Sequence, residues 1–421
     1  MAASLVSRRR DRYRLAASLR GRALPRGPRQ PRKGAAGRKN RLGLAFAPMF
    51  EVAAAACATL LGALAYLAYY LRWLGRLTRG NAYFGRTLAE RRAIKQAIAR
   101  RHRLGRLLLA AAGYLGGRRR VPAAWFAGIS APRLKCTRRT LERAFYFRPT
   151  ARDVIVATQM KCGTTWMQQI VYEILMHGRG DLSDTGHRHI CAVSPWIESF
   201  DNVSIDEAPL LGPSQRRVIK THFPASLCPY SPEAKYVYVT RHPASCFAST
   251  ADFAKLLGGP LCPSRERLLE LFCSRRMWWG PWPAHVAGWW EWSRRYPNVL
   301  FLHFEEMRDD LREAVRRVAR FLEEPLSPEE LDRVVAKADY AYMKAHEEAF
   351  EMSPPTPFSV AGDFMKSGRR DRYRDASPAE RRRIIEYCRA ELAGSSYPAA
   401  RFYPELAPAP LAAGAQRARA L

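Results

Sequence analysis

Residues 160–166, MKCGTTW, place a lysine, a glycine and two threonines between a β-branched run and a helix-like run. The free amides of a helix N-terminus attract anions, and a lysine beside them adds a positive charge. The turn therefore predicts a nucleotide phosphate site. It differs from a Walker A loop, because Lys161 precedes Gly163 whereas GxxxxGK[ST] places its lysine after the last glycine.

Two later segments carry residues that suit the same site. In RVIKTHFP, residues 217–224, His222 follows a buried-looking strand whose carboxyl end would direct it toward the crevice of the loop. A neutral-range imidazole is a credible general base, and a histidine that is hydrogen-bonded within the fold is the alternative. In YVYVTRHPASCFAS, residues 236–249, Arg241 and Ser249 can share a phosphate, or the arginine can form a surface ion pair.

Short β-branched runs alternate with helical segments from Asp153 onward, which predicts an α/β domain with a central parallel sheet flanked by helices. The strands are expected at Val154–Ala157, Arg217–Thr221, Tyr236–Thr240 and Val299–His303. The helices are expected at residues 164–177, 243–256, 282–296, 308–323, 327–337 and 377–393.

In this order the motifs resemble those of the cytosolic-type sulfotransferases, which move a sulfuryl group from 3′-phosphoadenosine 5′-phosphosulfate (PAPS) to a hydroxyl or amine. The family's YPKSGTTW, KTHLP and RNxxDxxxS correspond to TQMKCGTTW, KTHFP and RHPASCFAS. The segment GPWPAHVAGWWEWSRRYPNVLFLHFEEMRDD is similar to the family's GSWxxHVxxWWE stretch. The resemblance implies a P-loop nucleoside-triphosphatase-like sulfotransferase fold over residues 141–396, with PAPS as the donor and no metal.

The resemblance also implies roles for the loop. Lys161 would contact the transferring sulfuryl group and the bridging oxygen, and Gly163, Thr164 and Thr165 would hold the 5′-phosphate. Cys162 belongs to the same donor site and stands where the family has serine, which removes a hydroxyl donor.

Further donor contacts are implied outside the loop. Trp166 would stack on the adenine, with Tyr340 on its other face. Arg241 and Ser249 would bind the 3′-phosphate.

The family's C-terminal phosphate motif, RKGxxGDW, is degraded here to KSGRRDRY. Lys366, Ser367 and Gly368 are donor-binding candidates, and Ser367 stands where the family has a lysine. Arg369 and Arg370 are expected to compensate for the lost charge.

The implied mechanism is an in-line displacement at sulfur. His222 would be the general base, Lys220 an assisting cation, and Lys161 with the loop amides would stabilise charge on the leaving phosphate. A wall of aromatic side chains is expected for a small-molecule or lipid-like acceptor, with core packing as the alternative for each: Trp196, Phe200 and Phe223.

The formal charge of +32 is concentrated in the N-terminal third. Residues 1–120 contain 28 of the 70 basic and 3 of the 38 acidic residues, so the remainder is an ordinary, mildly basic domain. Nucleic acid is therefore not expected as a partner. The nine cysteines include no CxxC pair and no metal-ligand spacing, which favours a reducing compartment.

Five regions are expected along the chain. They are a disordered basic tail (1–45), a transmembrane helix (46–75), a basic helical linker (76–140), the sulfotransferase domain (141–396) and a C-terminal tail (397–421). Residues 52–71 lack charge over a length that can cross a membrane, and tyrosines at one end resemble an interfacial belt. We expect a single-pass anchor with a cytoplasmic catalytic domain; the alternatives are a buried or surface helix and an organelle transit peptide.

Two other functions compete with sulfuryl transfer. One is a nucleotide kinase-like phosphotransferase, which the position of the lysine argues against. The other is an inactive relative that binds membranes or nucleic acid through the basic region. A homodimer is allowed, although the family's KxxxTVxxxE element has no clear counterpart after Tyr373.

Overall fold

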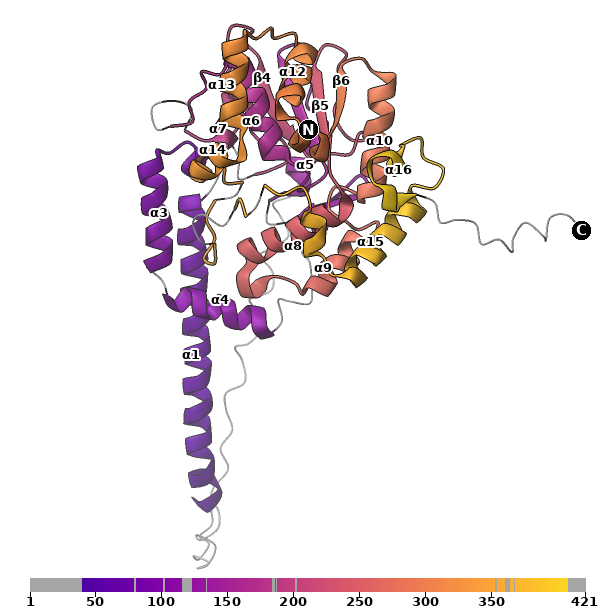
Figure 1. The fold of residues 1–421 in the computed structure, drawn as a ribbon. Coiled ribbons are helices and arrows are strands. Elements are labelled where there is room, and N and C mark those ends of the chain that lie inside the picture. Colours follow the sequence, from indigo (N-terminus) through magenta and orange to yellow (C-terminus); the bar gives the residue numbers. More distant parts are fainter. Residues whose placement is uncertain are drawn as a thin grey trace, which may run out of the picture. The chain divides into compact units, whose positions relative to one another are not determined.

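Figure 1 shows the computed structural model of the chain. It describes residues 40–78, 81–100, 103–115, 123–133, 135–183, 186, 188–200, 203–352, 354–359, 364–366 and 368–407. The predicted tails up to residue 39 and from residue 408, and the predicted site residue Ser367, lie outside these residues. The chain divides into two units, Met1–Leu61 and Gly62–Leu421.

Four parallel strands form the central sheet of the second unit. They are β3 (Asp153–Thr158), β4 (Arg217–Thr221), β5 (Lys235–Thr240) and β6 (Val299–His303), in the order β4-β3-β5-β6. Each predicted strand is confirmed to within one residue at either end. Since β3 lies between β4 and β5, the chain segments that leave these three strands begin at one edge of the sheet.

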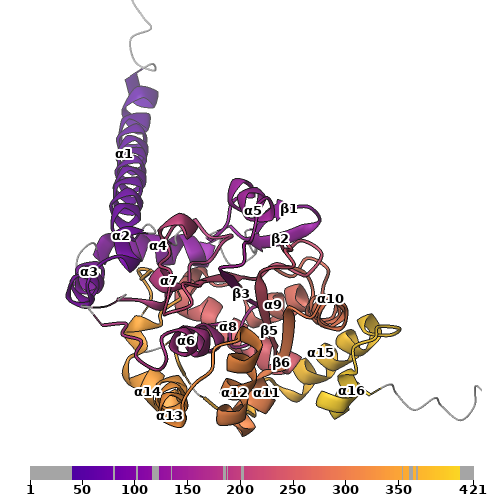
Figure 2. The same cartoon turned by 90° about the horizontal axis from the view of Figure 1, so that it is seen from above.

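Alternate residues of the strands enter two different hydrophobic cores. In β3, Ile155 and Ala157 pack with one cluster, whereas Val154 and Val156 pack with the other. Figure 2 shows α6, α12 and α13 on one side of the sheet and α9, α10 and α15 on the other. Both faces are covered, which explains why the strands are continuous apolar runs. The predicted α/β class with a flanked parallel sheet is therefore confirmed.

Twelve helices belong to this layered region in the described part of the chain. The six that precede β6 in the chain are α5 (Arg138–Phe145), α6 (Thr164–Leu175), α7 (Ile190–Val193), α8 (Pro243–Gly258), α9 (Arg265–Phe272) and α10 (Trp282–Arg295). The later ones are α11 (Phe304–Asp309), α12 (Leu311–Leu322), α13 (Pro328–Ala338), α14 (Tyr340–Ala345), α15 (Pro378–Glu391) and α16 (Ala399–Phe402).

The helix predicted at residues 308–323 is two helices, α11 and α12. They meet at Asp310, which has non-helical backbone angles and whose side chain accepts a hydrogen bond from the backbone N–H of Glu313. Aspartate is a favoured N-cap residue because its carboxylate satisfies a free amide of the first turn. The local cap thus overrides the continuous helical pattern.

The predicted helical linker, residues 76–140, contains a β-hairpin. Strands β1 (Ala123–Phe126) and β2 (Ile129–Pro132) pair antiparallel. Ala127 and Gly128 have φ angles of 45° and 83°, which a two-residue hairpin turn of this type requires. The linker predicted as helical therefore contains two strands in addition to its helices.

Four helices precede the hairpin: α1 (Asn40–Thr78), α2 (Asn81–Phe84), α3 (Leu88–Arg100) and α4 (Arg103–Leu115). The basic tail predicted to residue 45 is thus helical from Asn40 onward. Among the described helices, the stretch Val52–Thr78 of α1 is long and apolar enough to cross a membrane. In the predicted interfacial belt, Tyr69 is exposed but Tyr70 is fully buried, because its ring lies against Gly105 of α4.

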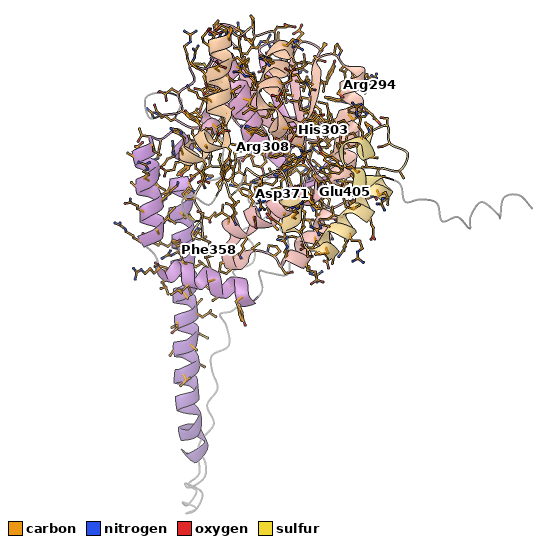
Figure 3. All side chains as sticks on the ribbon, viewed as in Figure 1. Arg294, His303, Arg308, Phe358, Asp371 and Glu405 are labelled. Carbon is orange, nitrogen blue, oxygen red and sulfur yellow. The ribbon has the colours of Figure 1, made fainter. Side chains whose placement is uncertain are left out.

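The packed domain continues past residue 396, where a tail was predicted. Tyr397 and Tyr403 are buried, and the ring of His303 stacks on Phe402 at 3.6 Å. His303 is labelled in Figure 3. Residues 397–407 therefore belong to the domain, because their aromatic side chains fill a gap beside β6.

Candidate active site

The loop between β3 and α6 has the geometry of an anion site. Gly163 is the residue before α6, with φ of 103°, and no side chain caps the helix there. A Cβ atom at this position would lie 2.8 Å from Cδ2 of Phe304, so only glycine fits without displacement. The first amides of α6 therefore remain available to a ligand anion, as the sequence predicts.

Lys161 carries its ammonium group into a buried, positively charged region. Its Nζ atom lies 4.3 Å from the ring centre of Phe253 and 5.0 Å from that of Phe364. Burial, and then the charges of Lys220 and Arg241, lower the pKa of Lys161 to about 7. A bound anion would oppose both causes and restore the charge of this lysine.

The parallel register of β3 and β4 positions His222. Ala157 pairs with Thr221, so Thr158 and His222 follow side by side at the carboxyl ends of the two strands. The Nδ1–H of His222 donates to the carbonyl oxygen of Thr158 at 2.8 Å, a tautomer assigned from this partner. Nε2 then keeps its lone pair, and burial holds the pKa of His222 well below its usual value. The imidazole is thus a neutral base.

The carboxylate of Glu198 holds Thr221 and His222 in place. Its Oε1 accepts from the backbone N–H of His222 and from the hydroxyl of Thr221, both at 2.7 Å. Burial raises the pKa of Glu198, and its Oε2 is buried without a hydrogen-bond partner among the described residues. The sequence analysis selected Trp196 and Phe200 on either side of Glu198 and missed this carboxylate.

Lys220 and Trp196 lie next to this histidine. A β-bridge joins the two residues, and Nζ of Lys220 lies 4.3 Å from the Trp196 ring. Burial lowers the pKa of Lys220 to about 8. The Trp196 ring meets His222 edge to face with centroids 5.1 Å apart. Lys161, Lys220 and His222 are therefore brought to one region, in keeping with the sequence prediction.

Arg241 and Ser249 meet as predicted. Nη1 of Arg241 donates to Oγ of Ser249 at 3.4 Å, and Nη2 donates to the carbonyl oxygen of Arg369 at 3.3 Å. The guanidinium lies 4.0 Å from the Phe304 ring, and its Nε is buried with no hydrogen-bond partner in the described residues. Burial lowers the pKa of Arg241. This arrangement leaves donor capacity for an anion.

Trp166 and Tyr340 are placed by α6, α13 and α14. Nε1 of Trp166 donates to the carbonyl oxygen of Ala338 at 2.7 Å, two residues before Tyr340. The Tyr340 hydroxyl donates to the carbonyl oxygen of Met365 at 3.1 Å. A Cβ atom at Gly368 would lie 2.7 Å from the Tyr340 ring, so the C-terminal segment packs closely against that tyrosine.

The basic side chains of the C-terminal segment are paired with acids. Nζ of Lys366 lies 3.9 Å from Asp252. Arg369 pairs with Asp375 at 2.6 Å, and Arg370 pairs with Asp309 at 2.7 Å. Compensation for the lost family lysine would therefore require these pairs to open.

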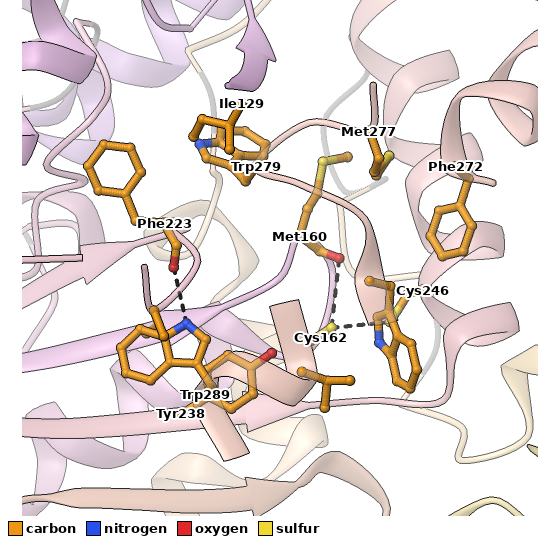
Figure 4. Packing of buried hydrophobic residues seen from close by; sticks show 14 of the residues in the cluster. Ile129, Met160, Cys162, Phe223, Tyr238, Cys246, Phe272, Met277, Trp279 and Trp289 are labelled. Carbon is orange, nitrogen blue, oxygen red and sulfur yellow. Dashed lines mark hydrogen bonds between the residues drawn. The ribbon is translucent and has the colours of Figure 1, made fainter. Parts of the chain in front are cut away.

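Cys162 and Cys246 are in contact beneath the loop. Their sulfur atoms lie 3.2 Å apart, and both side chains are fully buried (Figure 4). Burial raises the pKa of Cys162 well above its usual value, so the residue is a neutral thiol. Cys162 thus packs into the core below the anion site and its side chain is not presented to a ligand.

The three predicted acceptor-wall residues lie in three different environments. Trp196 contacts His222, Phe223 is fully buried in the core, and Phe200 is 45% exposed. Trp279 also lies here, with its ring 4.8 Å from that of His222. Its left-handed φ of 59° was not predictable from the surrounding tryptophans.

A separate cavity of about 630 Å³ adjoins Lys161. Phe253 and Phe364, the two rings that hold the Lys161 ammonium, line it together with Leu256 and Phe358. Phe358 is labelled in Figure 3 beside α4 and α8. The volume and apolar lining are typical of a small-molecule site. None of the three predicted acceptor-wall residues lines this cavity.

Comparison with protein families and known proteins gives one consistent result. The family model described as Sulfotransferase domain matches residues 151–396. Human sulfotransferase 2A1 is 32% identical over 230 residues, which cover 52% of the chain and 76% of that protein. Sulfotransferase 1B1 of Mus musculus is 31% identical over 209 residues, covering 48% of the chain and 69% of that protein.

Two crystal structures resemble the fold at low sequence identity. Mouse sulfotransferase SULT7A1 complexed with PAP has a TM-score of 0.50 and 19% identity, covering 65% of this chain and 95% of that chain. Retinol dehydratase in a complex with retinol and PAP has a TM-score of 0.50 and 20% identity, covering 64% and 88%. These two proteins therefore share the fold of this chain.

Proposed function

The chain belongs to the sulfotransferase family, and from this premise we propose that it transfers the sulfuryl group of PAPS to a hydroxyl or amine of a small, largely apolar acceptor. The related structures that contain PAP, the adenosine 3′,5′-bisphosphate left after transfer, support this donor. The observation that carries this proposal is that a neutral imidazole and a partly buried lysine meet at the edge of the sheet, beside an uncapped helix N-terminus.

The proposed donor site uses two anion-binding regions. The amides and hydroxyls of Thr164 and Thr165, with Gly163, hold the 5′-phosphate at the start of α6. Arg241 and Ser249 hold the 3′-phosphate, which satisfies the buried Nε and neutralises the guanidinium. Trp166 and Tyr340 flank the adenine, and the segment of Lys366 and Gly368 lies beside them.

The proposed chemistry is a displacement at sulfur. Nε2 of His222 takes the acceptor proton as the acceptor oxygen attacks, because Nδ1 is already committed to Thr158. The new S–O bond forms as the bond from sulfur to the phosphate oxygen breaks. Lys161 stabilises the charge on that leaving oxygen, and Lys220 adds a second buried cation near the sulfuryl group.

Substitution His222→Ala tests this proposal. We expect loss of sulfuryl transfer with nearly unchanged affinity for adenosine 3′,5′-bisphosphate, measured by product formation and isothermal titration calorimetry. His346→Ala is the matched control, because His346 is exposed. Substantial residual turnover in His222→Ala would contradict the assignment of the base, whereas absence of turnover in the unaltered protein with any acceptor would contradict sulfuryl transfer.

The helix α1 supports a proposed membrane association. Its stretch Val52–Thr78 satisfies the length and hydropathy of a membrane span, and basic residues flank it on both sides. We propose a single-pass anchor with a cytoplasmic catalytic domain. Flotation of the full chain with lipid vesicles, compared with a variant that carries Leu60→Arg and Leu64→Arg on the exposed face of this stretch, tests the association; equal flotation would contradict it.

A further inference from the structure

The cavity beside Lys161 has a wall that the sulfotransferase motifs do not supply. Residues of α3 and α4, which precede the matched region 151–396, line it together with the end of α8 and the proline-rich segment around Phe358. The helix α4 is held in place by two close glycine contacts. Gly105 lies against the Tyr70 ring, and a Cβ atom at Gly113 would lie 2.8 Å from the carbonyl oxygen of Pro260.

One group of charged side chains at this cavity consists of matched ion pairs. Lys95 on α3 forms ion pairs with Glu351 and Glu348, and Arg92 pairs with Glu348 at 2.7 Å. This cluster contains two cations and two carboxylates, and its Glu351 is the acid among the lining residues. Its formal charges therefore balance.

Arg106 of α4 is the remaining charged lining residue. It is partly buried and has no ion pair with any residue that the structure describes. An arginine that lines an apolar cavity and has no carboxylate partner within the described part of the chain favours a ligand anion, because the low dielectric strengthens a charge-assisted pair. A planar guanidinium suits a carboxylate or sulfonate in a two-point contact.

The cavity thus presents two different ends to a ligand. At one end the rings of Phe253 and Phe364 contact the Lys161 ammonium, where sulfuryl transfer is proposed. The wall that carries Arg106 comes from α4, which contacts the chain at Pro260, just after α8 ends at Gly258. The α-helical rise places Gly258 about 7.5 Å along α8 from Phe253. Apolar side chains, among them Leu257 and Phe358, lie between.

We propose that this cavity binds an amphiphilic acceptor that has a hydroxyl at one end, an apolar body, and an anionic carboxylate or sulfonate recognised by Arg106. The proposal rests on the proposed sulfuryl transfer at Lys161, and it makes α4 a specificity element of the acceptor site. The hydroxyl end lies toward Lys161 and His222, and the anionic end lies against α4.

Straight-chain ω-hydroxy carboxylates of increasing length, each with its methyl ester, are suitable probes. Their binding to the full chain saturated with adenosine 3′,5′-bisphosphate is measured by calorimetry, which needs no turnover. We expect the acid to bind roughly tenfold more tightly than its ester, the order of a charge-assisted hydrogen bond. The preference should be greatest at one chain length, which reports the span from Lys161 to Arg106.

Arg106→Gln should remove the preference for the acid and leave the affinity of the ester unchanged. Arg103→Gln is the control, because Arg103 is exposed on the same helix and does not line the cavity. Unchanged thermal unfolding and nucleotide affinity would show that Arg106→Gln folds. Equal binding of acid and ester by the unaltered chain, or an acid preference that survives Arg106→Gln, would overturn the inference. Selective acid binding without any sulfuryl transfer would instead overturn the proposed function alone.

Discussion

Donor binding should draw a proton onto Lys161. The pKa of this lysine is lowered to about 7 by burial and by the charges of Lys220 and Arg241, so a large part of it is neutral in the empty protein at pH 7.5. With a pKa of 7 the neutral fraction is roughly three quarters. A bound PAPS anion favours the ammonium form, and binding should therefore take up about three quarters of a proton per site.

Donor affinity should fall as the pH rises above 7. Below pH 7 the lysine is already charged, so protonation adds no cost to binding. Above pH 7 each pH unit adds about 1.4 kcal/mol, or a tenfold loss of donor affinity, until the pKa of the bound state is reached. Lys220, whose pKa is about 8, steepens the dependence above pH 8 if its charge is also needed.

Calorimetry in buffers of different ionisation enthalpy measures the uptake. At pH 7.5 the phosphates of PAPS are already ionised, so they contribute little to the proton count. Lys161→Met should abolish most of the uptake, and it should lower turnover more than donor affinity. Lys255→Met is the control, because Lys255 is exposed on α8. An unchanged proton uptake in Lys161→Met would refute the reasoning.

Two further substitutions test the anion sites. Gly163→Ala should destabilise the protein, measured by urea unfolding, by about 1–2 kcal/mol from its left-handed φ and by a further ~1–3 kcal/mol from the contact with Phe304. Gly394→Ala isolates the backbone effect, since Gly394 has φ of 83° and open space around it, and an equal loss in both variants would contradict the steric argument. Arg241→Ala should weaken adenosine 3′,5′-bisphosphate binding by about ten- to hundredfold and leave adenosine 5′-monophosphate binding unchanged; a similar loss for both nucleotides would argue against a 3′-phosphate contact.

The strands and the anion loop could be predicted because their signals are local. Each strand is a short β-branched run, and a strand of a sheet that is covered on both faces can be recognised from such a run alone. The loop is recognisable from the spacing of Lys161 and Gly163. The orientation of His222 could not be predicted from the sequence, because its tautomer depends on a carbonyl group that the register of β3 and β4 places beside it.

The missed features depend on contacts between distant segments. Cys162 and Cys246 are 84 residues apart in the chain, and Arg106 reaches a cavity shared with residues near 253 and 358. Neither contact has a periodic or motif signal. The β-hairpin at residues 123–132 was hidden for a related reason, since its two short strands are stabilised by pairing with each other and by the Trp279 amide, which donates to Ser130.

The charge distribution connects the donor and acceptor sites. The charges of Lys220, Arg241 and Arg372 lie close enough to Lys161 to lower its pKa, and Asp252 opposes them. A buried excess of positive charge destabilises the empty site and is relieved when a multivalent anion binds. The same Lys161 ammonium lies against Phe253 and Phe364, which line the cavity proposed for the acceptor. Donor binding thus recharges the lysine at the wall of the acceptor cavity, so acceptor affinity should respond to the occupancy of the donor site.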